Sequence, residues 1–502
     1  MISLSAAVAY HARVTPDRLA VIAGEHRISY RDLDARLRTT AGFLASRGVG
    51  KGDVIALLMK NSAAFLELAL AVSHVGAVLL PINFRLAGPE IDYILTNAGA
   101  RLLFVDEEFV AAAPASVDHV VVTPPARDDS RRIAGSAAPV ARGIHLEPHD
   151  LFRLMYTSGT TDHPKGVTHT YDNYYWKCLD HILALGLNAA DRMLVVGPLY
   201  HVGAFDLPGL AVLLVGGSLC VMRDFDADAV LATIAREGLT CGWAAPVMLN
   251  GMLAASGRGR HDLLSFRWLI GGGERTPEER IREFSTLFTR ARYVDAYGLT
   301  ESCSGDTLME AGYEIAKIGS TGRAVPHVEV EIRDDAGATL PAGTSGEICL
   351  RGPKVTRGYW RDPEKTKASF FGEWFRTGDI GHLDADGFLY LTDRKKDMII
   401  SGGENIASSE VERVIYQLAQ VSEAAVVGVP DPRWGERVVA AVVLKPGTRL
   451  DALELERHCR LHLGGFKIPR ELVVREALPR NPSGKVLKRV LRDELTRDAR
   501  RV

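Results

Sequence analysis

Cysteines, net charge and a targeting segment are all scarce or missing in this 502-residue sequence. Its six cysteines form no CxxC pair and no Cys/His cluster, so we expect reduced thiols and no zinc site. The 60 basic and 62 acidic residues leave a net charge of -2, whereas nucleic-acid-binding domains are usually strongly basic. The N-terminus lacks a basic segment followed by a long apolar run, which predicts a cytoplasmic protein without a signal peptide.

Uninterrupted apolar runs long enough to cross a membrane are also absent. Residues 65–84 contain Glu67, His74 and Pro81, and the uncharged run 207–222 is shorter than the ~18 residues that a membrane-spanning helix needs. Both stretches suit buried helix–strand units. The composition is that of an ordinary globular protein, 47% hydrophobic and 24% charged, and the chain is long enough to form more than one domain.

Helical and strand-like patterns alternate from residue 1 to about residue 330. Short apolar runs that predict strands lie at 53–59, 101–106, 119–123, 192–197, 218–222, 266–272 and 291–298, with helical segments such as 31–48 between them. This alternation predicts an α/β fold with helices on both faces of its sheets. From residue 328 a period of two with turn-rich breaks predicts antiparallel strands and a small β-barrel subdomain.

The pattern changes again near residue 394, where a charged segment leads into a short strand-like run and a pair of glycines. In the helix predicted next, Ser409 and Glu412 have the spacing of a capping box, and apolar residues recur on one face at 411, 414, 415 and 418. Two strand-like runs follow, at 423–431 and 436–447. We therefore divide the chain into a large N-terminal domain, 1–395, and a smaller, mobile α+β C-terminal domain, 396–502.

The segment MYTSGTTDHPKG, residues 155–166, concentrates hydroxyls, glycines and a lysine after a strand-like run. Successive backbone N–H groups in such a turn form a concave anion site, and open α/β sheets bind ligands at strand ends. Side-chain donors are available from Thr157, Ser158, Thr160, Thr161 and Lys165. The segment is not a Walker A motif, and a plain surface turn is the alternative interpretation.

Four further motifs follow in order: YGLTES at 297–302, WFRTGDIG at 374–381, DRKKDMIISGGEN at 393–405 and PRNPSGKVLKR at 479–489. With the glycine loop they span more than 300 residues, and the sequence thereby resembles the adenylate-forming superfamily. That superfamily includes acyl- and aryl-CoA synthetases, nonribosomal adenylation domains and beetle luciferases. The segments GWAAPVML, KDMIISGGEN and PRNPSGK most resemble the fatty-acyl and aryl-acid CoA ligases.

The resemblance implies an enzyme that works in two half-reactions with ATP, Mg²⁺ and coenzyme A. A carboxylate attacks the α-phosphate of ATP to give an acyl adenylate and pyrophosphate, and the CoA thiol then displaces AMP. The first step brings an anion to a polyanion. Positioning and charge neutralisation are therefore the main catalytic needs.

The resemblance also assigns contacts to the phosphates of ATP. The β- and γ-phosphates would lie against residues 157–165, including Gly159, and the α-phosphate would contact Thr300. Thr161 and Glu301 would lie near Mg²⁺, a cation that prefers oxygen ligands and bridges phosphates.

The nucleoside part of ATP is assigned to the later motifs. Tyr297, with Gly298 after it, would stack on adenine, and Asp379 would accept hydrogen bonds from the ribose hydroxyls with Arg394 assisting. A carboxylate suits two vicinal hydroxyls because it is an acceptor only. Beside adenine and the acyl group, where relatives often have Gly-Ala-Pro, this chain has Gly272, Gly273 and Glu274.

The C-terminal domain would act through a lysine and a hinge. Lys485 would bridge the substrate carboxylate and the α-phosphate in the first half-reaction. In this family the small domain then rotates about a pivot, here Lys396, which withdraws Lys485. Rotation would bring Ser401 to Glu404 towards the pantetheine channel, where Gly402 and Gly403 allow close backbone approach to a ligand. Acetylation of Lys485 would remove its charge and is a regulatory hypothesis.

The acyl site would be lined by residues that are mostly small or aromatic. His201, in PLYHVGA, matches a family position that lines or gates this site. The other candidates are Trp243, Gly203, Gly271 and Ser302. Small residues leave volume, so we expect a medium- or long-chain fatty acid, an aryl acid or a bulky cyclic acid. An amino acid is not expected, because no obvious acid marks a pocket for a substrate ammonium group in the region near Asp206.

Two other functions stay open at this point. A stand-alone adenylating enzyme would pass its acyl group to a carrier protein, and a non-catalytic nucleotide or acyl binder is suggested by Asp162 and the GGGE segment. Relatives usually have glycine at Asp162, and we expect its charge to weaken ATP binding without abolishing catalysis. Retention of Lys165, Glu301, Asp379, Arg394 and Lys485 favours an enzyme. We expect no nucleic-acid partner and no integral membrane association, with a homodimer as one possible assembly.

Overall fold

The computed structural model describes residues 3–157, 164–272, 276–394, 397–401, 404–480 and 486–499. No helix within these ranges combines the length and the apolarity that crossing a membrane requires. The apolar stretch 65–84 forms helix α3 (Ala63–His74) and strand β4 (Val78–Pro81), and 207–222 forms α9 (Ala211–Leu214) and β10 (Ser218–Val221). Both stretches are therefore the buried helix–strand units expected from the sequence.

A nine-stranded sheet runs in the order β15-β14-β13-β12-β11-β9-β10-β1-β2, with the strands from β13 to β1 parallel. Besides β10, its members are β1 (Leu19–Ala23), β2 (His26–Ser29), β9 (Arg192–Val195), β11 (Cys241–Ala244), β12 (Trp268–Gly271), β13 (Arg292–Tyr297), β14 (Thr307–Leu308) and β15 (Arg323–Ala324). β13 is the last parallel strand, so its carboxyl end, at Tyr297, opens at the edge where α/β sheets bind ligands.

A six-stranded sheet runs in the order β6-β5-β3-β4-β7-β8. Besides β4, its members are β3 (Val54–Leu58), β5 (Ala100–Asp106), β6 (His119–Val122), β7 (Leu151–Thr157) and β8 (Lys165–Thr170). The last two strands are antiparallel, and Thr157 at the end of β7 pairs with Lys165 at the start of β8. The ends of the predicted phosphate loop are thus fixed side by side on one sheet edge.

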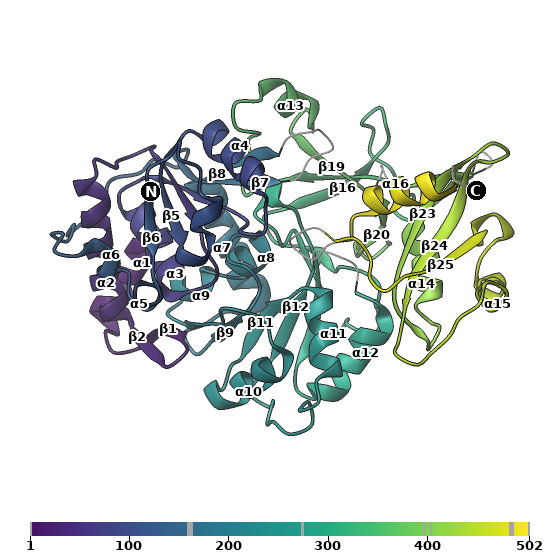
Figure 1. The fold of residues 1–502 in the computed structure, drawn as a ribbon, viewed down its shortest axis with the longest axis horizontal. Coiled ribbons are helices and arrows are strands. Elements are labelled where there is room, and N and C mark those ends of the chain that lie inside the picture. Colours follow the sequence, from purple (N-terminus) through teal and green to yellow (C-terminus); the bar gives the residue numbers. More distant parts are fainter. Residues whose placement is uncertain are drawn as a thin grey trace.

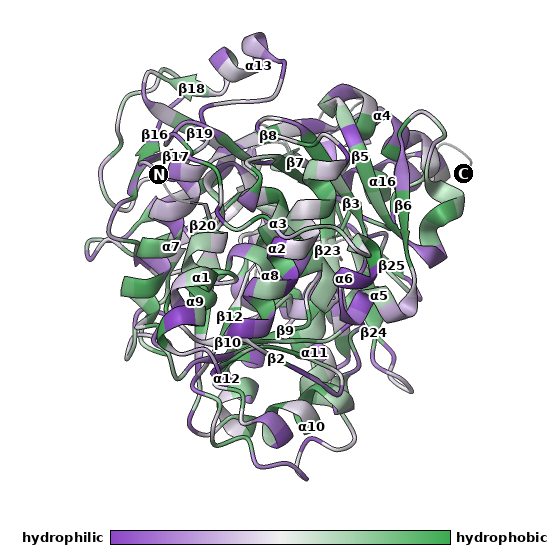
Figure 2. Ribbon diagram, turned by 90° about the vertical axis from the view of Figure 1, so that its left-hand side faces the viewer, coloured by the Kyte–Doolittle hydropathy of each residue, from purple (hydrophilic) through white to green (hydrophobic). Residues whose placement is uncertain are grey.

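Helices cover both large sheets (Figure 1). They are α1 (Ser5–Val14), α2 (Tyr30–Ser46), α4 (Gly88–Ala98), α5 (Pro124–Asp128), α6 (Arg131–Ala134), α7 (Tyr171–Leu185), α8 (Val202–Asp206), α10 (Ala227–Glu237), α11 (Pro246–Ala254) and α12 (Glu278–Leu287), with 3-10 turns η1 (Glu107–Ala112) and η2 (Thr300–Ser302). Helix α3 contacts β1 of one sheet and β4 of the other, and every one of its residues is buried. Hydrophobic residues concentrate along central strands such as β3, and hydrophilic ones on peripheral helices such as α10 (Figure 2).

Helix α7 follows β8 directly, and its start is fixed by local hydrogen bonds. The Thr170 hydroxyl accepts from the backbone N–H of Asn173, and the Asn173 side chain accepts in return from the Thr170 N–H. This reciprocal pair satisfies two helix N–H groups that have no intrahelical partner. Gly186 ends the helix in the left-handed conformation, with φ 62°.

The antiparallel strands expected from residue 328 form a five-stranded sheet. Its members are β16 (Glu329–Arg333), β17 (Gly346–Arg351), β18 (Phe370–Phe371), β19 (Trp374–Leu383) and β20 (Leu389–Arg394), with helix α13 (Pro363–Ala368) before β18. β19 and β20 pair so that Asp379 lies opposite Arg394. The third sheet therefore brings two of the predicted nucleotide-binding residues onto neighbouring strands.

The C-terminal elements have hydrophobic cores of their own and lie at one end of the molecule, beside β20 (Figure 1). They are β21 (Ile399–Ser401), β22 (Glu404–Ile406), α14 (Ser408–Ile415), β23 (Val421–Asp431), β24 (Gly435–Leu444), α15 (Ala452–His462), η3 (Gly465–Lys467), β25 (Glu471–Val474) and α16 (Lys488–Ala499). The apolar positions predicted for this helix, Val411, Val414, Ile415 and Leu418, are all buried, although α14 ends at Ile415 and Leu418 lies beyond it.

The predicted capping box at Ser409 and Glu412 is wrong. The N-cap of α14 is Ala407, which has no side-chain cap. The Ser409 hydroxyl instead donates to the carbonyl of Thr392 on β20, and the Glu412 carboxylate accepts from the backbone N–H of Val426 at 2.7 Å. Tertiary partners therefore take both side chains away from the local cap.

Candidate functional site

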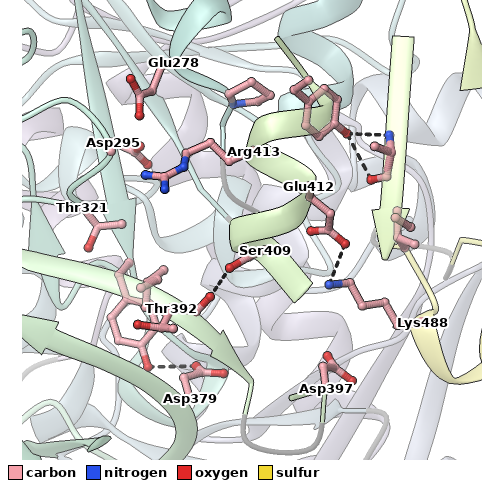
Figure 3. A pocket seen from close by; sticks show the side chains of 18 of the residues that line it. Glu278, Asp295, Thr321, Asp379, Thr392, Asp397, Ser409, Glu412, Arg413 and Lys488 are labelled. Carbon is pink, nitrogen blue, oxygen red and sulfur yellow. Dashed lines mark hydrogen bonds and ion pairs between the residues drawn. The ribbon is translucent and has the colours of Figure 1, made fainter. Parts of the chain in front are cut away.

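A cleft of about 260 Å³ lies where the carboxyl end of β13 faces the C-terminal elements (Figure 3). The N-terminal part of the chain contributes Asp295, Tyr297, Gly298, Thr321 and Asp379 to its lining. The C-terminal part contributes Ser409, Glu412, Arg413 and Lys488. The cleft thus brings together Tyr297, Gly298 and Asp379, which the sequence assigned to one nucleoside site.

Tyr297 and Asp379 are joined by a hydrogen bond in this cleft. The Tyr297 hydroxyl donates to Oδ2 of Asp379 at 2.9 Å, and both side chains are buried (Figure 3). Burial and the neighbouring Asp379 raise the pKa of Tyr297 well above its usual value, so the phenol stays a donor. The next residue must be glycine, because a Cβ at Gly298 would lie 2.3 Å from the backbone nitrogen of Gly305.

The opposite wall of the cleft is formed by α14 and the start of α16. Lys488 pairs with Glu412 at 2.8 Å (Figure 3). It also contacts the Ser408 hydroxyl at 2.5 Å. The Arg413 side chain extends from α14 across the cleft (Figure 3). Sequence reasoning overlooked Arg413 and Lys488, although Lys488 lies three residues after the lysine of the NPSGK motif.

Lys165 and Glu301 face the same tyrosine. The Tyr359 hydroxyl donates to Oε1 of Glu301 at 2.8 Å, and the Lys165 ammonium lies 6.0 Å from the centre of the Tyr359 ring. Partial burial, followed by the charge of Lys365, lowers the pKa of Lys165. The backbone N–H of Thr356 also donates to the Glu301 carbonyl, at 2.6 Å. Sequence reasoning missed Tyr359, whose signal would have been the aromatic pair in RGYW at 357–360.

The Glu301 carboxylate has the donor chemistry that the predicted magnesium role requires. Mg²⁺ commonly binds one or two carboxylates and completes its shell with water and substrate phosphates. Among the described residues, no three His, Cys, Asp or Glu side chains converge on a metal site of their own. A single carboxylate near the strand that carries Lys165 therefore suits a metal that arrives with a polyphosphate.

The glycines expected to leave open volume in the acyl site are covered by neighbouring side chains. A Cβ at Gly203 would lie 2.4 Å from the Trp243 indole, and one at Gly271 would lie 1.5 Å from the Tyr293 hydroxyl. The fully buried Ser302 hydroxyl donates to the Asp306 carboxylate. These small residues allow close packing of their neighbours, so glycine content does not itself measure the space available to an acid.

His201 caps the short helix α8, where its Nδ1 accepts from the backbone N–H of Gly203 at 3.2 Å. The ring therefore sits on the turn that packs against Trp243. Asp206, at the other end of α8, is fully buried, and both of its carboxylate oxygens accept from Arg153, at 2.9 and 2.6 Å. An ammonium group of a substrate would have to displace that arginine.

Several predicted site residues lie outside the described ranges. These are Ser158, Gly159, Thr160, Thr161, Asp162, Gly273, Glu274, Lys396, Gly402, Gly403 and Lys485. Their immediate neighbours are described: Gly272 follows β12, and a Cβ there would lie 3.1 Å from the Ala296 carbonyl beside the cleft. Roles for the undescribed residues stay predictions.

The six cysteines are all buried and unpaired: Cys178, Cys220, Cys241, Cys303, Cys349 and Cys459. Burial raises the pKa of every one of these thiols. Buried thiols with raised pKa values carry little thiolate at neutral pH and are therefore poor nucleophiles.

Two family models match the chain. One, described as AMP-binding enzyme, matches residues 8–360, and the other, described as AMP-binding enzyme C-terminal domain, matches residues 410–485. Among curated proteins, the chain is 36% identical over 477 residues to a long-chain-fatty-acid–CoA ligase of Mycobacterium tuberculosis, covering 93% of each chain. It is also 36% identical over 477 residues to a feruloyl-CoA synthase of Amycolatopsis, covering 95% of this chain and 96% of the relative.

Among solved structures, the chain resembles o-succinylbenzoate CoA synthetase from Bacillus subtilis in complex with its acyl-adenylate intermediate. The TM-score is 0.89 at 31% identity, with 98% of each chain covered. The same synthetase in complex with ATP and a magnesium ion matches with a TM-score of 0.86 at 31% identity, covering 96% of this chain and 98% of the other. The two-part α/β architecture is thus shared along almost the whole length.

Proposed function

This chain belongs to the AMP-binding enzyme family, and we propose that the cleft and the Thr300–Glu301 turn together form its catalytic site. The protein is an AMP-forming carboxylate–CoA ligase. It uses ATP, Mg²⁺ and coenzyme A to convert a carboxylic acid first into an acyl adenylate and then into a thioester. The hydrogen-bonded pair of Tyr297 and Asp379, in a cleft that both parts of the chain line, carries the proposal for the site.

Tyr297 and Asp379 bind the nucleoside in this proposal. The Tyr297 ring stacks on adenine, with Gly298 and Gly272 next to it. Asp379 accepts from the ribose hydroxyls, with Arg394 assisting from the neighbouring strand. The proposal is supported by the Tyr297 hydroxyl, which fixes the orientation of the Asp379 carboxylate from one side. A fixed acceptor loses less conformational freedom when the ribose binds.

The phosphates extend from this cleft towards β8. Residues Thr157 to Lys165 receive the β- and γ-phosphates, and the Thr300 hydroxyl contacts the α-phosphate. Glu301 and Thr161 would hold the Mg²⁺, which would supply charge neutralisation for the phosphates. Support comes from Tyr359, which brings Lys165 and Glu301 to one place.

The two domains have different tasks in this proposal. The N-terminal domain, 1–395, holds ATP and the acid, and the C-terminal domain, 396–502, turns about Lys396. Lys485 takes part in adenylation, and Gly402 and Gly403 approach the pantetheine arm in thioester formation. The side-chain contacts of α14 with β20 and with α16 support a C-terminal domain that meets the cleft directly.

The acid lies next to His201, Trp243, Gly203, Gly271 and Ser302 in this proposal. Packing of the Trp243 indole on Gly203 makes the aromatic face, rather than empty glycine space, the surface that an acyl group would meet. An apolar acid of the fatty, aryl or bulky cyclic class suits that face. The Asp206 carboxylate is already bound by Arg153, which argues against an amino acid.

Pyrophosphate release over a panel of acids tests the proposal. The panel extends from acetate through long-chain fatty acids to aryl and polycyclic acids, with and without CoA, and thioesters are identified by mass spectrometry. Acid-dependent release that rises with CoA is expected, and Asp379→Ala should abolish it. Release that ignores CoA would favour a carrier protein as acceptor, and best turnover of acetate would contradict the acyl site. A cytoplasmic location, a homodimer, the effect of Asp162 and acetylation of Lys485 stay predictions.

A further inference from the structure

A buried histidine holds the turn that carries Thr300 and Glu301. His169, on β8, is 0% exposed, and its Nε2 lies 2.7 Å from the Thr300 carbonyl oxygen. That carbonyl belongs to the first residue of η2. Because His169 and Lys165 are four residues apart on β8, their side chains point to the same face of the sheet. One face of a single strand therefore reaches both ends of the proposed phosphate site.

The partners of the ring settle which nitrogen carries the proton. Nδ1 of His169 lies 3.1 Å from Nε and 2.9 Å from Nη2 of Arg153, and a guanidinium can only donate. Nδ1 must therefore accept, which leaves the N–H on Nε2 to donate to the Thr300 carbonyl. Burial, followed by the charge of Arg153, lowers the pKa of His169 to about 3, so the neutral ring persists at working pH.

Arg153 is itself fixed in place. It is 0% exposed, and it donates from Nη1 and Nη2 to the two carboxylate oxygens of Asp206 at 2.9 and 2.6 Å. Its guanidinium carbon lies 5.1 Å from the centre of the Phe205 ring and 5.5 Å from that of Tyr174. Bidentate geometry and close packing remove most of the freedom of the arginine. The order of contacts is Asp206, Arg153, His169 and Thr300.

We propose that His169 is a positioning residue for the ATP-dependent half-reaction. By holding the Thr300 carbonyl, it fixes the turn that presents the Thr300 hydroxyl and the Glu301 carboxylate to the phosphates. The inference rests on the proposed function of those two residues. Glu301 is also held by Thr356 and Tyr359, and the Thr300 carbonyl also accepts from the backbone N–H of Cys303 at 3.1 Å within the turn. The contact of His169 adds a side-chain donor that ties the Thr300 end of the turn to β8.

Two substitutions separate the two hydrogen bonds of the ring. In His169→Asn the amide oxygen can replace Nδ1 as acceptor for Arg153, but the donor to Thr300 is lost. In His169→Gln the amide nitrogen can replace Nε2 as donor to Thr300, but the acceptor for Arg153 is lost. A purely structural histidine would make both variants lose activity in proportion to their loss of thermal stability. If the histidine positions the turn, the variants would instead lose activity out of proportion to their loss of thermal stability.

The assays are pyrophosphate exchange for the first half-reaction, CoA transfer from a supplied acyl adenylate for the second, calorimetric binding of MgATP, and thermal melting. His169→Asn should lower kcat of exchange about 10- to 100-fold while CoA transfer changes less than about threefold. MgATP affinity should fall less than kcat does. His169→Gln should melt at lower temperature yet retain more of the exchange activity. The exposed His119 on β6 supplies the control, and His119→Asn should match the wild type in every assay.

The same assays on Thr300→Val and Glu301→Gln separate the proposed function of the Thr300–Glu301 turn from the inference about His169. If both variants keep full exchange, the proposed function of the turn is wrong. If they lose exchange while His169→Asn keeps it, the inference about His169 alone is overturned. It is also overturned if the Asn and Gln variants lose exchange in step with their melting temperatures. Loss of exchange in His169→Asn at near-normal melting temperature supports it.

Discussion

Replacing Asp206 by asparagine should destabilise the N-terminal part of the enzyme more than any surface change of the same chemistry. Asp206 and Arg153 are both 0% exposed, and two short hydrogen bonds join them. Asparagine keeps the shape but presents one amide N–H to a guanidinium N–H, and it leaves the arginine charge without a partner. Removing one member of a buried pair costs about 3–5 kcal/mol because the remaining charge stays buried.

That cost translates into a measurable shift of the melting temperature. Unfolding entropy is about 2.1 cal/mol/K per residue, so an N-terminal part of about 390 residues has about 0.8 kcal/mol/K. A loss of about 3–5 kcal/mol should then lower its melting temperature by about 4–6 °C. Differential scanning calorimetry resolves a shift of that size. The matched control is Asp17→Asn, which breaks an exposed ion pair with Arg31 and should cost under about 1 kcal/mol.

A double variant separates stability from catalysis. Arg153→Met with Asp206→Leu removes both charges, and such apolar replacements of buried pairs are often neutral or stabilising. The melting temperature should recover, whereas pyrophosphate exchange should not, because His169 has lost the arginine that fixes its ring. If Asp206→Asn lowers the melting temperature no more than Asp17→Asn does, then leaving Arg153 without its carboxylate does not destabilise the fold as predicted. If the double variant recovers exchange, Arg153 does not act through His169.

Three other changes test separate parts of the site. Tyr359→Phe removes a hydrogen bond to the Glu301 carboxylate, worth about 1.5–3 kcal/mol, and should slow pyrophosphate exchange about 10- to 100-fold; a change under about threefold would contradict the role of the phenol. Gly203→Ala places a methyl group 2.4 Å from the Trp243 indole, so kcat/KM for the bulkiest acids should fall about tenfold relative to short acids, and an unaltered ratio would place the acyl group elsewhere. Because partial burial lowers the pKa of Lys165, its charge is lost at lower pH than that of a free lysine. The KM for ATP should therefore rise earlier on the alkaline side than in Lys165→Arg, and coincident pH profiles would contradict this.

The sequence predicted those features that depend on local pattern. Apolar runs identified strands β3, β5, β6, β9, β10, β12 and β13 of the two large sheets, because a buried strand is apolar whatever its partners, but they did not identify β1, β2 or β11. The capping box at Ser409 and Glu412 failed because both side chains have partners far away in sequence, Thr392 and Val426. The spacing of residues along the sequence cannot show that distant hydrogen-bond partners compete with a local helix cap.

For the site, too, the sequence predicted single residues but not the contacts between them. Motifs identified Tyr297 and Asp379 separately, but the hydrogen bond between them joins residues 82 positions apart and appears only in the fold. His169 and Tyr359 were missed because each looks like an ordinary strand or loop residue until its partner is known. The glycines were interpreted as empty space because the sequence does not reveal that Trp243 and Tyr293 lie over two of them.

The burial of all six cysteines has a consequence for an enzyme that handles a thiol. Disulfide exchange with oxidised coenzyme A needs an accessible thiolate, and thiols that are buried with raised pKa values offer almost none. The enzyme can therefore bind a sulfur nucleophile at high concentration without forming mixed disulfides with it. A cysteine introduced on the surface of α16 would therefore be labelled selectively with a fluorophore, and the proposed movement of the C-terminal domain could be tested by fluorescence without removing any native cysteine.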